Sequence, residues 1–270
     1  MKVLDFLQGS PGPGDAWTFN LGRRLHGAFG GANGGVIGAT CLAASRSLVH
    51  DRVPASLDVR FLRGLTEGEA RVVPSVVHEG RTLSVVSVDI FDQRDRLCTR
   101  ATASLVNTDA LEPLDYPSPA ELHEGSVHYA DGKPWAKPAS GVEVPLIDTF
   151  QPRLVRQDER GYATEVKVLW DEPGTCAEAA CVAADISVGP PVGAFVRGKP
   201  VPIPNPDLTL RFCGEPDLPD TMTATCRLEQ VSKGIASTRI TVHAGGELVA
   251  IGISTTTLLA GAWPDARKPN

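Results

Sequence analysis

In two stretches of the chain, residues 17–106 and 147–258, short runs alternate apolar and polar residues. This is the pattern of β-strands with one buried face. At Leu57, Val59 and Phe61, for example, the apolar positions fall at every second residue. Turn residues such as Glu79-Gly80 separate neighbouring runs, as expected between antiparallel strands. The strands that this pattern predicts span residues 17–21, 56–63, 70–78, 82–91, 97–106, 147–156, 163–170, 203–212, 221–231, 236–243 and 248–258.

Each stretch also holds one apolar segment without alternation, and both segments favour a helix. For the first, a glycine-rich opening at residues 25–31 runs into a helix that ends near Val49. The second spans residues 176–188, where many side chains are the small ones of alanine and cysteine, so that other elements can pack closely on this helix. Consecutive prolines disfavour a continuing helix. We therefore expect the second helix to stop at Gly189-Pro190-Pro191.

The order of elements occurs twice, and so do some of the residues. Residues 56–63 match residues 207–214, an offset of 207 − 56 = 151, and residues 80–106 match residues 234–259, starting at an offset of 234 − 80 = 154. A repeat of this length indicates a duplicated domain. The economical packing curls each antiparallel sheet around its own helix, and the two sheets can then join edge to edge.

Prolines and acidic residues with little periodicity separate the two copies, as in a linker that crosses the surface. The sequence therefore predicts an N-terminal half at residues 1–110, a linker at 111–145, a C-terminal half at 146–262 and a tail at 263–270. Residues 1–15 are rich in glycine and proline, and we expect them to form a loose lead-in.

The composition is that of an ordinary globular protein, and the net charge argues against some classes of binding partner. Of 270 residues, 42% are hydrophobic and 21% are charged, and the formal net charge is −6. This charge argues against nucleic acid and anionic membranes as main partners. No apolar run approaches about 18 residues and the start is too short for a signal peptide, so we expect a cytoplasmic protein. The six cysteines form no Cys-x-x-Cys pair, which favours buried thiols over disulfides or a metal site.

One carboxylate draws attention, Asp185, near the end of the second apolar helix. Burying a carboxylate there is costly unless something uses it, and the alternative is an exposed polar residue at a helix end. The first helix cannot supply a general base, because no Asp or Glu occurs between Asp15 and Asp51. A duplicated protein of this kind has kept at most one carboxylate-based centre.

The first helix has glycines instead, at Gly27, Gly30 and Gly31. Uncovered backbone N–H groups at a helix start favour an anion, although close packing of a helix on a sheet also demands glycine. His26 beside them is the most suggestive of the histidines, and a packed or capping histidine is its simpler interpretation. Alternating β–α units, which a dinucleotide-binding fold needs, are missing, and no Gly-x-Ser-x-Gly elbow occurs.

Several segments together resemble one family. They are residues 25–31 (Leu-His-Gly-Ala-Phe-Gly-Gly), 57–63, 79–81, 101–105, the helix with Asp185, 207–212 and 248–250. With these segments the chain resembles the double-hotdog acyl-CoA thioesterases of type II over nearly its whole length, apart from the lead-in and the linker. The resemblance implies an α+β double hotdog, in which two tandem halves each wrap an antiparallel sheet around one long central helix.

The resemblance also implies hydrolysis of an acyl-CoA thioester by water, without a metal, a covalent intermediate or any cofactor beyond the coenzyme A of the substrate. The Asp, Thr and Gln that hold the attacking water in this family fall on Asp185, Asn205 and Ser254. The last two depart from the family pattern but can still hydrogen-bond a water. Simple alternation turns Asn205 to the outer face, so its flanking prolines must break the strand if it is to reach Asp185.

On this hypothesis the amides of Gly30 and Gly31, beside His26, bind the oxyanion of the substrate. The expected partner is a small-molecule acyl-CoA, and hotdog sheets often pack further, so a homo-oligomer is compatible with this fold. Two other functions stay open. A hotdog enoyl-thioester hydratase or dehydratase usually wants an Asp–His pair, and Asp185 has no nearby histidine in the sequence. A non-catalytic acyl-CoA binding protein would carry the departures at Asn205 and Ser254 as signs of decay.

Overall fold

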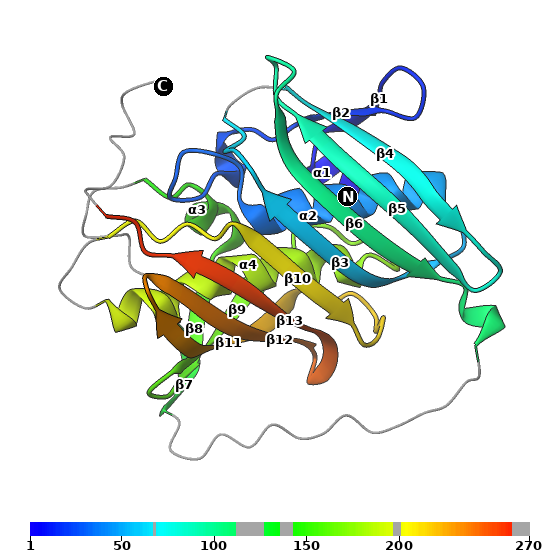
Figure 1. Ribbon diagram of the computed structural model, residues 1–270. Coiled ribbons are helices and arrows are strands. Elements are labelled where there is room, and N and C mark those ends of the chain that lie inside the picture. Colours follow the sequence, from blue (N-terminus) through cyan, green and yellow to red (C-terminus); the bar gives the residue numbers. More distant parts are fainter. Residues whose placement is uncertain (67–68, 112–126, 136–142, 197–200, 261–270) are drawn as a thin grey trace.

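A computed structural model describes residues 1–66, 69–111, 127–135, 143–196 and 201–260 (Figure 1). The strands are β1 (Gly9–Pro11), β2 (Trp17–Asn20), β3 (Val53–Phe61), β4 (Glu69–Glu79), β5 (Leu83–Phe91), β6 (Leu97–Val106), β7 (Val127–Pro134), β8 (Arg153–Gln157), β9 (Gly161–Lys167), β10 (Asp207–Phe212), β11 (Thr221–Ser232), β12 (Ile235–Ala244) and β13 (Glu247–Thr257). The helices are α1 (Val3–Phe6), α2 (Gly34–Leu48), α3 (Leu146–Phe150) and α4 (Cys176–Phe195), with short 3-10 turns at η1 (Arg23–Leu25) and η2 (Thr108–Ala110).

Within the described ranges these strands form one continuous sheet in the order β1-β2-β4-β5-β6-β3-β10-β13-β12-β11-β9-β8-β7. Every neighbouring pair is antiparallel. The two halves meet where β3 pairs with β10, and Asp58 lies opposite Thr209 there. These two residues also correspond at the repeat offset, since 209 − 58 = 151. The pairing therefore places an approximate twofold axis at this point, and the expected edge-to-edge joining of the sheets is confirmed.

Helices α2 and α4 lie against each other on one face of the sheet (Figure 1). α2 packs on β3–β6, and α4 packs on β9 and β11–β13. Glycine permits the close approach of the helices: a Cβ on Gly35 would lie 2.4 Å from the Cys181 carbonyl oxygen, and a Cβ on Gly38 would lie 3.3 Å from Cys181 Cβ. The two helices thus share one layer that covers the joined sheet.

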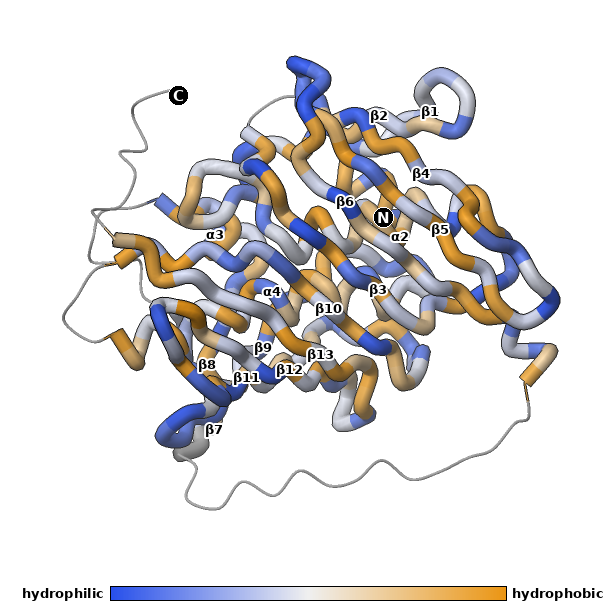
Figure 2. The backbone as a smooth tube through the Cα atoms, in the orientation of Figure 1, coloured by the Kyte–Doolittle hydropathy of each residue, from blue (hydrophilic) through white to orange (hydrophobic). Residues whose placement is uncertain are grey.

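The core fills the space between the helix layer and the sheet. Along β5 the residues Ser84, Val86, Val88 and Ile90 are fully buried, and the positions between them are not. Figure 2 shows the same alternation of hydropathy along the other strands. The alternation that predicted the strands therefore identifies the face that packs on the helices.

α4 continues past the point where the sequence predicted its end. Pro190 and Pro191 lie inside the helix, which runs on to Phe195. Val192 is fully buried and packs with Leu228 and Ala236. Burial of this apolar contact offsets the hydrogen bonds that the prolines cannot donate, so tertiary packing overrides the local stop signal.

Three other segments also differ from the expectation. Residues 146–150 form helix α3 instead of the start of a strand, and Gln151 ends it in the left-handed conformation, with φ of 47°. The first residues are not loose, because α1 buries Val3, Phe6 and Leu7 in the core. Strand β7 falls within the predicted linker and pairs with β8 at the sheet edge. Linker residues 112–126 and 136–142, and tail residues 261–270, lie outside the described residues.

All six cysteines are free thiols, of which Cys213 is exposed and the others are buried. Among the helices of the described ranges, none combines the length and the apolar character that crossing a membrane would need.

Candidate active site

Asp185 lies near the middle of α4, where this helix crosses the start of α2. Its side chain is buried, with 8% of its surface exposed. Asn33 Nδ2 donates to Asp185 Oδ2 at 2.6 Å, and Asn205 Nδ2 donates to Oδ1 at 2.6 Å. One carboxylate oxygen therefore accepts a hydrogen bond from the N-terminal half, and the other accepts one from the C-terminal half. The exposed helix-end interpretation of Asp185 is wrong.

Asn33 is the N-cap residue of α2 and was not singled out by the sequence. Its Oδ1 accepts from the backbone N–H groups of Gly35 and Val36, at 3.0 and 3.3 Å. The signal was present, because Asn is among the preferred N-cap residues and stands directly before the apolar helix. The sequence placed the glycine-rich opening of the helix at residues 25–31, whereas α2 begins at Gly34.

Gly34 and Gly35 let the carboxylate reach the end of α2. A Cβ on Gly34 would lie 2.6 Å from Asp185 Oδ1 and 2.7 Å from the ring of Phe61. The backbone N–H groups of both glycines also act on the carboxylate, since each lowers the pKa of Asp185. Asp185 thus sits at the positive end of the helix dipole, where an anion is favoured.

Opposing effects act on the ionisation of Asp185. Burial raises its pKa above the usual range for Asp, and the hydrogen bonds from Asn205, Gly35, Asn33 and Gly34 lower it. Burial is the larger effect, because a carboxylate loses its hydration in the interior and this penalises the charged form. The site therefore contains a base that is stronger than an exposed Asp but still has donors for its charged form.

Asn205 reaches Asp185 because it precedes the strand. β10 begins at Asp207, so the proline-flanked Asn205 is free of the alternation that would have turned it outward. The prediction that these prolines must break the strand is confirmed.

Ser254 lies on β13 and has a different partner from the one expected. Its Oγ is fully buried and donates to the carbonyl oxygen of Asp207 at 2.7 Å. No hydrogen bond joins it to Asp185 among the described residues. This hydroxyl connects the start of β10 to the last strand, next to Asn205.

The glycine-rich loop before α2 is held by its own backbone. Gly27 N–H donates to the Gly31 carbonyl at 2.9 Å, and Gly30 N–H donates to the Gly27 carbonyl at 3.4 Å. A Cβ on Gly31 would lie 2.9 Å from the Leu65 carbonyl oxygen, so close packing requires glycine at this position. His26 is buried, and its Nε2 lies 3.1 Å from the Leu21 carbonyl oxygen. The loop thus brings Gly30 and Gly31 to the entry of α2 rather than into its first turn.

Part of the chain matches a known protein family. Residues 24–106 match the family model described as the acyl-CoA thioesterase N-terminal domain. The match lies within the N-terminal half of the chain, and this segment is similar to that family. The resemblance drawn from its residues is confirmed.

One relative and several solved structures are also similar to this chain. The protein SSO1253 of Saccharolobus solfataricus, named as an esterase, is 34% identical over 94 residues, which are 33% of this chain and 63% of that protein. The tesB protein of Mycobacterium avium subspecies paratuberculosis superposes with a TM-score of 0.73 at 19% identity, covering 95% of this chain and 98% of that one. A thioesterase II from Thermobifida fusca gives 0.75 at 15% identity, with 96% and 97% covered, and a hotdog protein from Alicyclobacillus acidocaldarius gives 0.74 at 16%, with 97% and 100% covered. These structures establish the hotdog fold along the chain.

Corresponding residues of the two long helices are separated by a different offset from that of the strands. Asn33 and Thr175 are the N-cap residues, and 175 − 33 = 142. Ser45 and Ser187 stand at the same offset, 187 − 45 = 142, and each donates to the carbonyl four residues earlier. At this offset the counterpart of Asp185 is residue 185 − 142 = 43, which is an alanine. Of the two helix junctions that the duplication creates, only the one at Asp185 has a carboxylate at this position.

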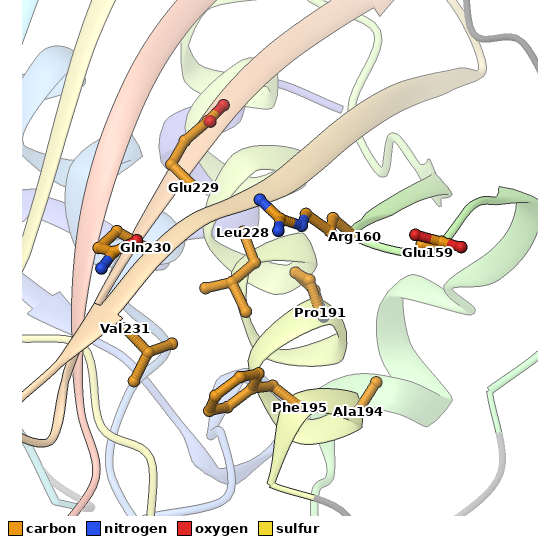
Figure 3. Close-up of a pocket in the computed structure, with 9 residues that line it drawn as sticks. All are labelled: Glu159, Arg160, Pro191, Ala194, Phe195, Leu228, Glu229, Gln230 and Val231. Atoms are coloured by element: carbon orange, nitrogen blue, oxygen red, sulfur yellow. The ribbon is translucent and has the colours of Figure 1, made fainter.

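A surface pocket of about 450 Å³ lies away from this junction, at the C-terminal end of α4 (Figure 3). It is lined by Glu159, Arg160, Pro191, Ala194, Phe195, Leu228, Glu229, Gln230 and Val231. Its α4 residues stand six to ten positions beyond Asp185, about 9–15 Å along the axis. The pocket does not contain Asp185, so the candidate site rests on the hydrogen-bonded carboxylate and not on the cavity.

Proposed function

We propose that the protein hydrolyses acyl-CoA thioesters with water that Asp185 activates, releasing the free acid and coenzyme A. The observation that carries this proposal is the buried carboxylate, which two side-chain amides hold at the N-terminus of the other half's helix. Its raised pKa suits a group that must accept a proton near neutral pH. The family of residues 24–106 supports the thioester as the substrate class.

In the proposed reaction a water next to Asp185 gives a proton to the carboxylate while its oxygen attacks the thioester carbonyl. Asn205 donates to Asp185 through Nδ2, and its Oδ1 is then the acceptor for the second hydrogen of the water. The carbonyl oxygen gains negative charge and is stabilised at the positive end of α2. The tetrahedral intermediate collapses by breaking the carbon–sulfur bond, and the proton held by Asp185 passes to the departing thiolate, which leaves as coenzyme A and restores the carboxylate.

The donors for the oxyanion are assigned to the backbone of the loop that enters α2. Gly30 N–H makes only a 3.4 Å bond to the Gly27 carbonyl, which is weak by the usual criteria and exchangeable for a bond to the substrate. Gly31 follows it in the chain. Ser254 is left out of the group that orients the water, because its hydroxyl donates to the Asp207 carbonyl; its proposed part is to anchor the strand start beside Asn205.

The test is release of free thiol from a panel of acyl-CoA substrates of increasing chain length. The Asp185→Asn variant keeps the size of the side chain and removes the basic oxygen, so we expect kcat to fall by about 10²–10⁴ with little change in substrate binding. Glu178→Gln is the matched control, because Glu178 is a second buried carboxylate on α4 and we expect it to leave kcat unchanged. A wild-type rate in the Asp185→Asn variant would remove Asp185 from the mechanism.

The same assay separates the other functions, because neither hydration of an enoyl thioester nor simple binding frees coenzyme A. The hydratase hypothesis needs a histidine beside the carboxylate. Both side-chain partners of Asp185 are asparagines, which favours hydrolysis.

A further inference from the structure

The amide of Asn33 has only one orientation that satisfies its surroundings. Oδ1 must accept from the N–H groups of Gly35 and Val36, because a capping oxygen cannot be replaced by an NH₂ group. Nδ2 is therefore turned to Asp185 Oδ2, 2.6 Å away. The Asn33 backbone is fixed as well, since its N–H donates to the Leu25 carbonyl at 2.9 Å. The cap thus determines that a donor faces the carboxylate.

A donor in this place distinguishes between the two forms of Asp185. Ionised Asp185 accepts from Asn33 on one oxygen and from Asn205 on the other. A protonated carboxyl group would direct its hydrogen at one of these NH₂ groups and lose that bond. The fixed amide therefore favours the carboxylate, which is the form that a base requires.

At the other helix junction, where α4 begins, the N-cap residue makes no such bond between the halves. Thr175, the counterpart of Asn33, accepts from Trp170 Nε1 at 2.9 Å and donates to the Glu172 carbonyl at 2.6 Å. Both partners belong to its own half. Of these two N-cap side chains, only that of Asn33 bonds across the halves, at the junction that has Asp185, so capping by itself does not account for Asn33.

We propose that Asn33 is a positioning residue that holds Asp185 in the carboxylate form and fixes its direction from the opposite half of the protein. Its effect on the rate rests on the proposed hydrolysis, and its effect on Asp185 does not. The role differs from that of Asn205, which caps no helix and which orients the water in the proposed reaction.

The ionisable groups named below are neutral, distant or paired, so the ionisation of Asp185 is controlled by the two asparagine amides. Cys181 on α4 and Cys226 on β11 face it, and burial raises the pKa of both thiols, so they stay neutral. α2 contributes no acid, and its one charged residue, Arg46, is in the last turn. Asp207 on β10 pairs with Arg60 of β3 at 3.8 Å.

Two variants separate the cap from the donor. Asn33→Ser keeps a good N-cap oxygen, but its short side chain cannot reach Asp185. Asn33→Asp keeps the cap and the size and replaces the NH₂ group by a carboxylate oxygen, which favours one shared proton. Asn107→Ser is the matched control, because Asn107 caps η2 through the Asp109 N–H at 3.1 Å.

The decisive measurement is the titration of the Asp185 carboxyl carbon by NMR, assigned with the Asp185→Asn variant. We expect the titration midpoint to rise by about one pH unit in Asn33→Ser and further in Asn33→Asp, with no change in Asn107→Ser. The acid limb of the kcat/KM profile should move by the same amount, and kcat/KM on that limb should fall about tenfold.

An unchanged midpoint of Asp185 in both Asn33 variants would overturn the proposal and leave Asn33 a structural cap. The same holds if Asn33→Ser changes only the melting temperature. If the wild-type protein releases no coenzyme A, the proposed hydrolysis fails, and the NMR titration still decides the role of Asn33. If Asn33→Ser does not fold, the same titration of the isosteric Asn33→Asp variant decides between the two roles.

Discussion

Arg46 Nε lies 3.7 Å from Glu178 Oε1 and joins the last turn of α2 to the first turn of α4. Glu178 is fully buried, and neither of its oxygens accepts a hydrogen bond within the described part of the chain. Arg46 Nη1 also lies 3.6 Å from Glu215 Oε1, so its charge is shared between two carboxylates. Burial raises the pKa of Glu178 to about 7, and the attraction of Arg46 only partly opposes this.

Glu178 should make the protein less stable as the pH rises. Its pKa is about 7 in the fold and ordinarily 4.5, so its stabilising contribution is complete below about pH 4.5 and is lost by about pH 7. Glu178→Gln cannot ionise. We expect a smaller fall in Tm across this window, and a free energy of unfolding about 1–3 kcal/mol above the wild-type value at pH 8. Thermal and chemical unfolding at a series of pH values measure both.

The control for this prediction is Glu229→Gln, because Glu229 forms an exposed ion pair with Arg239. That variant should keep the wild-type dependence of Tm on pH. An unchanged dependence in Glu178→Gln would mean that Glu178 does not change its ionisation in this range.

Glycine should be essential at the crossing of the two helices and dispensable near the C-terminal end of α4. A Cβ on Gly35 would lie 2.4 Å from a backbone oxygen, whereas a Cβ on Gly193 meets nothing within 4 Å. We expect Gly35→Ala to lower the free energy of unfolding by about 2–3 kcal/mol. Gly193→Ala should raise it by about 0.5–1 kcal/mol, because alanine has less freedom to lose in a helix. Denaturant unfolding of both variants tests this, and equal effects would contradict the close crossing.

Asn205 and Ser254 should differ in what their removal affects. Asn205→Ala deletes a hydrogen bond to a charged group, which is typically worth about 1.5–3 kcal/mol. We therefore expect kcat to fall about 10–100-fold. Ser254→Ala deletes a bond to a backbone carbonyl, so unfolding free energy should fall by about 1 kcal/mol while kcat stays near the wild-type value. Acyl-CoA hydrolysis and urea unfolding separate the two, and a larger kcat loss in Ser254→Ala would reverse the assignment.

Much of the fold was predictable because alternation along a strand reports directly on burial. Strand β5 illustrates this, since Val86, Val88 and Ile90 are buried at every second position of a segment that was predicted as a strand. The end of α4 was not predictable from local rules. Pro190 and Pro191 signal a stop, and the burial of Val192 against β11 and β12 overrides that signal only once the sheet is in place.

Asp185 and Asn205 of the candidate site were predictable, and Asn33 was not. Asp185 was identified because a carboxylate is rare in an apolar helix, and Asn205 because the family pattern pointed to it. Asn33 lies 152 positions from Asp185, and no periodicity relates residues on different helices at that separation. The same holds for Glu178, whose pairing with Arg46 depends on how α2 crosses α4.

The pairing of β3 with β10 has a consequence for how the protein was able to change. If two identical chains met at this seam, a substitution would alter both helix junctions at once, and neither could specialise without the other. With both copies on one polypeptide, position 185 holds an aspartate while its counterpart, Ala43, holds none. On one polypeptide the two junctions can differ: one holds Asp185 between two asparagine amides, and the other holds a buried carboxylate of a different kind, Glu178 beside Arg46.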